Sequence, residues 1–146
     1  MKKMMIVLAM VFTLITTTSF AGATVKQEVL NAFKTEFTKA TEVNWSVGDT
    51  YYKAAFTMND QKLFAFYSLD GEFLALTRNI SSLQLPLNLQ KSLKNRVTGQ
   101  WITDLFEVAN GEGTAYYITL ESADTKVVLK SVGGSDWTVY KKINKA

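Results

Sequence analysis

The apolar residues near the start of the chain follow a helical spacing and then change to alternation. In residues 25–37, VKQEVLNAFKTEF, apolar side chains recur every three or four positions: Val25, Val29, Leu30, Phe33 and Phe37. Such a stripe predicts an amphipathic helix packed against a core. The next segment, EVNWSV, places Val43, Trp45 and Val47 on one side and polar residues on the other. This alternation is typical of a half-buried strand.

Turn residues divide the following segment into further strands. Asn59-Asp60 separates two apolar runs by two residues, which predicts a β-hairpin with Asn59 and Asp60 at its tip. Asp70-Gly71 is a second turn signal. The expected strands of the first half cover residues 43–47, 51–58, 61–68 and 73–78.

The same pattern returns in the second half of the chain. Pro86 suits the first turn of a helix, in which Leu89, Leu93 and Val97 recur every fourth residue. Strands are expected over 102–108, 115–121 and 126–131, and from Trp137 onward. Apolar or aromatic residues of the two halves correspond at a constant offset of 64 positions. The corresponding pairs are Tyr52 and Tyr116, Ala54 and Ile118, Phe56 and Leu120, Leu63 and Val127, Ala65 and Leu129, and Phe73 and Trp137.

These correspondences predict an α+β chain with two tandem repeats, each a helix followed by a four-stranded antiparallel sheet. A chance likeness between two ordinary hairpins is the alternative. The repeats are expected at residues 24–80 and 81–146, sharing one compact unit. The correspondences between the two halves also assign the faces of the first hairpin. The helix-covered core is expected to take Tyr52, Ala54, Phe56, Leu63, Ala65 and Tyr67.

The opposite face of the first hairpin then carries Tyr51, Lys53, Phe64 and Phe66. On this face the second repeat offers only Ala115, Val128 and Lys130, so aromatic residues mark the first half as unusual. We expect the rings to lack an intramolecular cover and to bind a partner, with Lys53 as a charged rim. The alternative is that the linker, the C-terminal tail or the other repeat closes this face.

The first 23 residues have the three parts of a secretory signal peptide. Lys2 and Lys3 precede an apolar run, and Ala21-Gly22-Ala23 provides an A-x-A cleavage site. We expect cleavage after Ala23, with Ala21 as the alternative position. A membrane anchor is the competing interpretation, but the apolar run is shorter than the roughly 18 to 20 residues of a spanning helix. The chain is therefore expected to be periplasmic or secreted, without a stable membrane span.

Charge and composition exclude several classes of function. The 16 basic residues less Lys2 and Lys3, against 13 acidic ones, leave residues 24–146 a net charge of +1. This balance gives no electrostatic footprint for nucleic acid. The chain contains neither Cys nor His, which excludes thiol nucleophiles, His-based acid–base groups and zinc ligation by either residue. No cofactor and no metal site is expected.

Acidic residues offer no catalytic pair either. Asp49, Asp60, Asp70, Glu112 and Asp124 all fall at expected turns, where backbone geometry accounts for them. A glycosidase-type pair needs two carboxylates held at a set separation, and the spacing of the acidic residues along the sequence indicates no such pair. We therefore expect a protein that is not an enzyme.

Several segments together resemble a known family. The run AFKTEFTKATEVNWSVGDTYYKAAFTMN, then LFAFYSLDGEF and LPLNLQKSLKN, is similar to the PepSY-like family related to β-lactamase inhibitor proteins. The resemblance covers nearly all of residues 24–146. It implies an exported bacterial protein with tandem helix-plus-four-strand units, which form one curved antiparallel sheet with the helices on one face.

The resemblance also suggests how such a protein acts. The inhibitor for which the family is named blocks its enzyme with sheet-face aromatics and hairpin-tip residues, so a protein or peptidase inhibitor is one expectation. The sequence departs from the family pattern where Thr38 and Thr98 stand in place of proline, and the turn Ser68-Leu69-Asp70-Gly71 lacks one aspartate. The alternative function is a structural or sensing protein of the cell envelope that recognises peptides or small apolar ligands.

Overall fold

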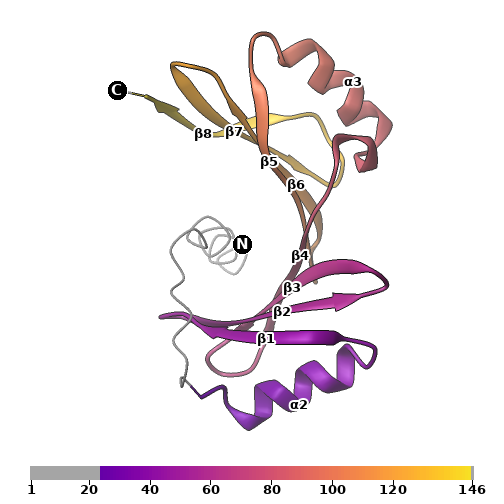
Figure 1. The fold of residues 1–146 in the computed structure, drawn as a ribbon. Helices are drawn as coiled ribbons and strands as arrows, with labels where there is room; N and C mark the ends of the chain where they lie inside the picture. The colour runs from indigo at the N-terminus through magenta and orange to yellow at the C-terminus, as the bar shows by residue number, and fades with distance from the viewer. Residues whose placement is uncertain (1–23, 146) are drawn as a thin grey trace. The chain divides into compact units, whose positions relative to one another are not determined.

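The structure is a computed structural model and describes residues 24–145 (Figure 1). It contains two α-helices, one short 3₁₀ helix and eight strands in the described residues. The elements are α2 (Gln27–Glu36), β1 (Thr41–Val47), β2 (Tyr51–Met58), β3 (Gln61–Ser68), β4 (Phe73–Asn79), η2 (Ser82–Gln84), α3 (Leu87–Arg96), β5 (Trp101–Asn110), β6 (Gly113–Glu121), β7 (Thr125–Val132) and β8 (Thr138–Asn144).

The eight strands follow their sequence order across one open antiparallel sheet, from β1 to β8. Each helix is followed by four strands, so the predicted α+β repeat architecture is confirmed. The chain divides into two compact units, unit 1 ending at Leu76 and unit 2 beginning at Thr77. This division falls within β4, whereas the sequence repeat places its boundary after residue 80, where that strand has ended.

In unit 1 the helix covers one face of the sheet. Val29 and Phe33 of α2 and Phe37, which follows its last residue, lie four residues apart and pack on β2 and β3. The ring of Phe33 meets Trp45 and Phe56 edge-on, with centroids 5.3 and 5.0 Å apart. The core also contains Tyr52, Ala54, Phe56, Leu63, Ala65 and Tyr67, so the predicted face assignment is confirmed.

Unit 2 repeats this core with different side chains. Leu89 and Leu93 of α3 pack with Leu105, Ile118 and Leu129 of the strands. Positions matched by the offset of 64 are buried in the core of both units. Ile118, Leu120 and Leu129 in unit 2 correspond to Ala54, Phe56 and Ala65 in unit 1. Each large apolar side chain buried in this way stabilises the fold by about 1.5–3 kcal/mol.

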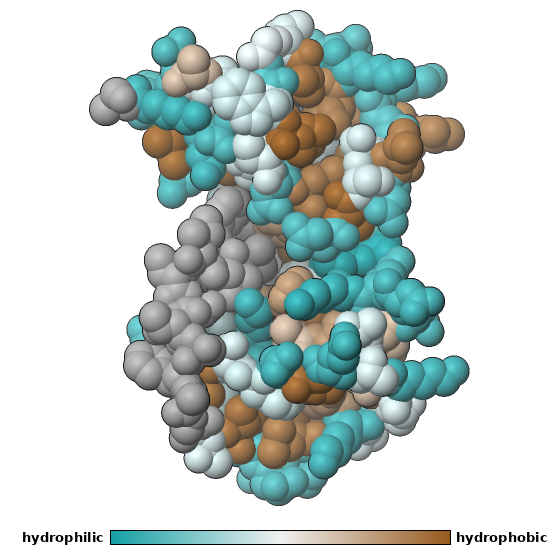
Figure 2. Space-filling view, viewed as in Figure 1, coloured by the Kyte–Doolittle hydropathy of each residue, from teal (hydrophilic) through white to brown (hydrophobic). Residues whose placement is uncertain are grey.

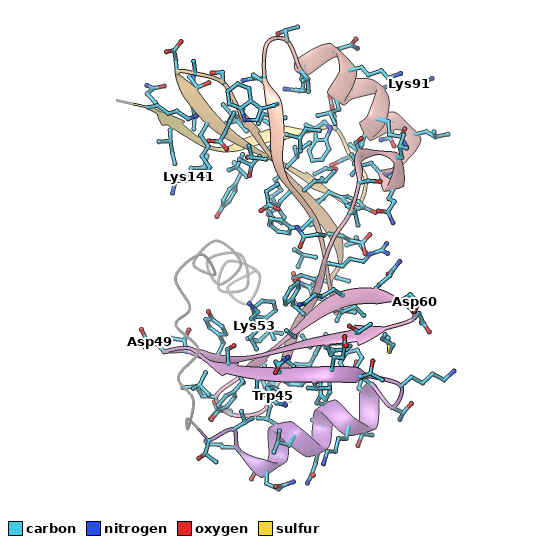
Figure 3. All side chains as sticks on the ribbon, in the orientation of Figure 1. Trp45, Asp49, Lys53, Asp60, Lys91 and Lys141 are labelled. Atoms are coloured by element: carbon cyan, nitrogen blue, oxygen red, sulfur yellow. The ribbon has the colours of Figure 1, made fainter. Side chains whose placement is uncertain are left out.

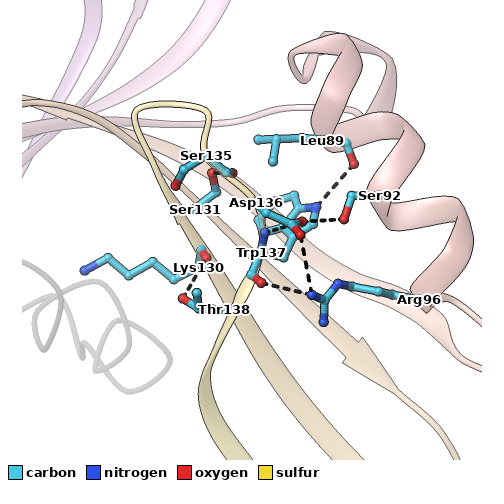
Figure 4. Close-up of polar contacts among 9 residues, drawn as sticks. All are labelled: Leu89, Ser92, Arg96, Lys130, Ser131, Ser135, Asp136, Trp137 and Thr138. Atoms are coloured by element: carbon cyan, nitrogen blue, oxygen red, sulfur yellow. Dashed lines mark hydrogen bonds and ion pairs between the residues drawn. The ribbon is translucent and has the colours of Figure 1, made fainter.

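The segment before β8 is attached to α3 by polar contacts (Figure 4). Trp137 is buried, and its indole Nε1 donates a hydrogen bond to the carbonyl oxygen of Leu89 at 3.2 Å. The carboxylate of Asp136 accepts hydrogen bonds from Ser92 Oγ and from the backbone N–H of Trp137, and these bonds lower the pKa of Asp136. Arg96 donates to the carbonyl oxygen of Trp137 at 3.1 Å. Trp137 is thereby held between helix and sheet.

The residues between β4 and α3 contain an ordered turn. Residues 82–84 form a 3₁₀ turn closed by a capping box between Ser81 and Gln84. The side-chain oxygen of Gln84 accepts a hydrogen bond from the backbone N–H of Ser81 at 2.8 Å. Such reciprocal bonds satisfy backbone groups that a linker would leave to water.

Candidate functional site

The four residues predicted to bind a partner lie together on one face of unit 1. In the β2–β3 register Lys53 is opposite Phe66, and Ala55 is opposite Phe64. Tyr51 has the same parity as Lys53 and is opposite Ser68. We call the face that carries Tyr51, Lys53, Phe64 and Phe66 the reverse face, because α2 packs on the other side. Figure 3 shows Lys53 on the reverse face and Trp45 on the side of α2.

Two of the four side chains are more buried than expected. Tyr51 is 6% exposed and Phe66 is 0% exposed, so the expectation that these two rings lack a cover was wrong. Their centroids lie 5.8 Å apart, and Phe64 and Leu74 pack against the pair. Lateral packing on the sheet thus encloses the two rings in a second, smaller cluster.

Lys53 and Phe64 form the accessible part of this face. Both side chains are partly exposed, and the ammonium nitrogen of Lys53 lies 4.8 Å from the centroid of the Phe64 ring. That distance fits a cation–π contact. Partial burial, and secondarily the charge of Lys62, lowers the pKa of Lys53. The ammonium group therefore sits in a partly dehydrated position above an aromatic surface.

Tyr51 is positioned by the turn before β2. A Cβ atom added at Gly48 would lie 2.7 Å from a ring carbon of Tyr51, so the ring occupies the space that a side chain would need. We expect Gly48→Ala to lower the free energy of unfolding by about 1–3 kcal/mol, the usual cost of overpacking. Urea denaturation followed by circular dichroism measures the change.

Gly111→Ala is the matched control, because nothing lies within 4 Å of a Cβ at that turn glycine. The control should change the unfolding free energy by less than about 1 kcal/mol. Equal effects of the two substitutions would contradict the close packing of Tyr51 on Gly48.

The predicted hairpin tip is also found. Asn59 and Asp60 connect β2 to β3 with φ angles of 52° and 60°, and Met58 pairs with Gln61 directly before and after them. Two consecutive positive φ angles are the signature of a type I′ turn, which asparagine and aspartate tolerate. Both residues are exposed. Their role in contacting a partner stays a prediction.

Unit 2 carries its own aromatic residues on the corresponding face, which the sequence reasoning missed. Phe106 and Tyr117 are cross-strand partners with stacked rings, 5.2 Å between centroids. Tyr140 meets Tyr117 edge-on at 5.8 Å, and the Lys130 ammonium lies 5.6 Å from the Tyr117 ring. The first half is therefore not unusual. The pair Tyr116-Tyr117 could have indicated this, because adjacent strand residues point to opposite faces and one of the two rings must therefore lie on this face.

Trp101 extends this face at the start of β5. It is opposite Glu121, which has the same parity as Tyr117, and it is 53% exposed. The Lys145 ammonium lies 5.6 Å from the Trp101 ring and 3.2 Å from the Glu121 carboxylate. An accessible ring beside a lysine thus occurs on this face in unit 2, as Phe64 beside Lys53 does in unit 1.

Comparison with solved structures gives several matches to this architecture. A BLIP-like protein from Bacteroides fragilis matches with a TM-score of 0.70 and 17% identity, covering 85% of this chain and 89% of that one. A DUF2874 family protein from Bacteroides ovatus matches with a TM-score of 0.73 and 21% identity, covering 84% and 89%. The chain shares their fold.

A predicted periplasmic protein from Bacteroides eggerthii also has this BLIP-like fold, with a TM-score of 0.71 and 16% identity over 84% of this chain and 90% of that one. No protein-family model matches the sequence, and no curated protein matches it. At these identities the likeness establishes the architecture, and function has to be argued from the site.

Within residues 24–145, no three His, Cys, Asp or Glu side chains come together in a way that could hold a metal ion. The five acids expected at turns all lie there and are exposed: Asp49, Asp60, Asp70, Glu112 and Asp124. Across the same residues, none of the helices has the length and hydrophobicity that a membrane crossing requires.

Proposed function

We propose that residues 24–146 are an exported, non-catalytic binding protein of the cell envelope, whose reverse face contacts a protein or peptide. One observation carries the proposal: the face that α2 does not cover presents Phe64 beneath the ammonium group of Lys53. Aromatic residues, phenylalanine among them, are enriched in protein interfaces, and a cation over a ring face adds an attractive contact. Tyr51 and Phe66 act as a packed support that holds Phe64 in place.

The comparisons support this proposal at the level of fold. The B. fragilis protein is described as BLIP-like, which favours an inhibitor-like binding role, and the B. eggerthii protein is described as periplasmic by prediction. Export is further supported by the signal-peptide pattern of the N-terminus. Ala23 and the rest of that segment lie outside the described residues.

The second candidate is an envelope protein that senses peptides or small apolar ligands. A cavity of about 450 Å³ beside α2 and β1 favours this function, since such volumes are typical of small-molecule sites. The two candidates use different surfaces of unit 1, so one experiment on the reverse face separates them.

Capture from an envelope extract tests the proposal. Residues 24–146 are immobilised and exposed to an extract from the organism that encodes the chain, and bound proteins are identified by mass spectrometry. We expect one protein in stoichiometric amount, lost with Phe64→Ser and retained with Thr35→Ser, a matched change on the exposed side of α2. Circular dichroism checks that both variants fold.

Two outcomes would overturn the proposal. A stoichiometric partner that binds equally to the Phe64→Ser variant would place the interface elsewhere on the molecule. A heterogeneous set of captured proteins and peptides, unaffected by either substitution, would favour the sensing function in its place.

A further inference from the structure

A cavity of about 450 Å³ lies between the C-terminal half of α2 and the edge strand β1. Its walls are largely apolar, and apolar surface is visible in this part of unit 1 in Figure 2. The principal lining residues are Leu30, Phe33, Lys34, Phe37, Val43 and Trp45. This cavity is on the helix side of the sheet and is separate from the reverse face.

The aromatic walls are fixed by the core of unit 1. Phe33 and Phe37 contact each other at 5.2 Å between centroids, and both rings also contact Phe56 at 5.0 and 4.9 Å. Trp45 is held by Phe33 on one side and by Tyr67 at 6.1 Å. Because these rings are fixed by contacts with one another and with the core, binding would require little reorganisation, which favours affinity.

Lys34 is the charged residue among those that line the cavity. Its side chain is exposed, and within residues 24–145 its ammonium group makes no hydrogen bond or ion pair. Thr38 adds a hydroxyl group to the same lining. An apolar chamber with an unpaired cation and a hydroxyl donor at its wall complements a molecule that has an apolar body and one anionic group.

We propose that this cavity binds a medium-chain carboxylate, with the hydrocarbon chain against the accessible apolar wall formed by Leu30, Val43 and Trp45, and the carboxylate at Lys34. A cavity of about 450 Å³ has room for such a chain, and the negative charge fits the single lysine that lines it. This inference does not depend on the proposed function of the reverse face, because the two surfaces share no residue.

Titration of residues 24–146 with decanoate tests the site through tryptophan fluorescence, since Trp45 forms part of the wall. We expect a saturable change below the micelle concentration of decanoate. Octanoate, two methylenes shorter, should bind about fifteenfold more weakly, because each buried methylene is worth roughly a factor of four. Decanol has the same chain without the charge and should bind more weakly than decanoate.

Lys34→Gln assigns the anionic contact. It should weaken decanoate binding about three- to tenfold, the usual range for one charge-assisted hydrogen bond at a partly exposed site, and leave decanol binding unchanged. Lys39→Gln is the matched control, because Lys39 is exposed and does not line the cavity. It should change neither affinity.

Methyl NMR shifts of Ala40 and Val43, which line the cavity, give a second readout independent of Trp45. No saturable response in either measurement would overturn the proposal. Equal binding of decanol and decanoate, with no effect of Lys34→Gln, would overturn the assignment of the carboxylate. Failure here leaves the reverse-face proposal standing, since that test uses Phe64.

Discussion

Replacing Phe33 with alanine will lower the free energy of unfolding by about 3–5 kcal/mol. The Phe33 ring is almost fully buried and makes edge contacts with Trp45 and Phe56 at the centre of the unit 1 core. Its removal leaves a cavity between α2 and the sheet that the surrounding side chains fill only in part. Urea denaturation followed by far-UV circular dichroism measures the loss.

Asn31→Ala on the exposed side of α2 is the control for Phe33→Ala. A surface change of this kind should stay within about 0.5 kcal/mol. If both variants unfolded at the same urea concentration, α2 would not be packed through Phe33 as described.

Trp137→Ala is expected to be comparably severe, at about 3–5 kcal/mol. Trp137 is 2% exposed, its ring fills the core between α3 and the sheet, and its indole N–H is bonded to Leu89. Trp137→Phe keeps an aromatic ring but loses the indole hydrogen bond, and a bond of this kind contributes about 1 kcal/mol. Thermal and urea unfolding of both variants measure the two contributions.

Trp101→Ala provides the contrast, because Trp101 is exposed and its contact with Lys145 is worth at most about 1 kcal/mol. The position of a tryptophan within its repeat also indicates whether the side chain faces the core. Trp45 and Trp137 follow the inward parity of their repeats, and the structure places both against a core. A loss with Trp101→Ala as large as that with Trp137→Ala would contradict the face assignment in unit 2.

The strands of the first hairpin could be predicted from sequence to the residue. Two apolar runs separated by Asn59-Asp60 admit one register, because a one-residue slip would turn every core side chain to the other face. The second unit followed by correspondence, since Ile118 and Leu129 occupy the places of Ala54 and Ala65. Periodicity and turn chemistry are local properties and can be read along the chain.

The burial of Tyr51 and Phe66 could not be predicted in the same way. It depends on Gly48 leaving space for a ring and on Leu74, which reaches the pair from another strand. The contact of Tyr140 with Tyr117 depends on a β-bulge between Val128 and Leu129, which shifts the register of β8. Parity assigns a side chain to a face, but lateral packing on that face decides how much of it remains accessible.

Photo-crosslinking from position 64 tests whether a protein or peptide binds the reverse face. Phe64 is replaced by p-benzoyl-phenylalanine in one variant and Thr35, on the exposed side of α2, in another. Both are irradiated in envelope extract from the organism that encodes the chain. We expect a single adduct of defined mass from position 64 and none from position 35. An adduct from position 35 alone, or none from position 64, would contradict it.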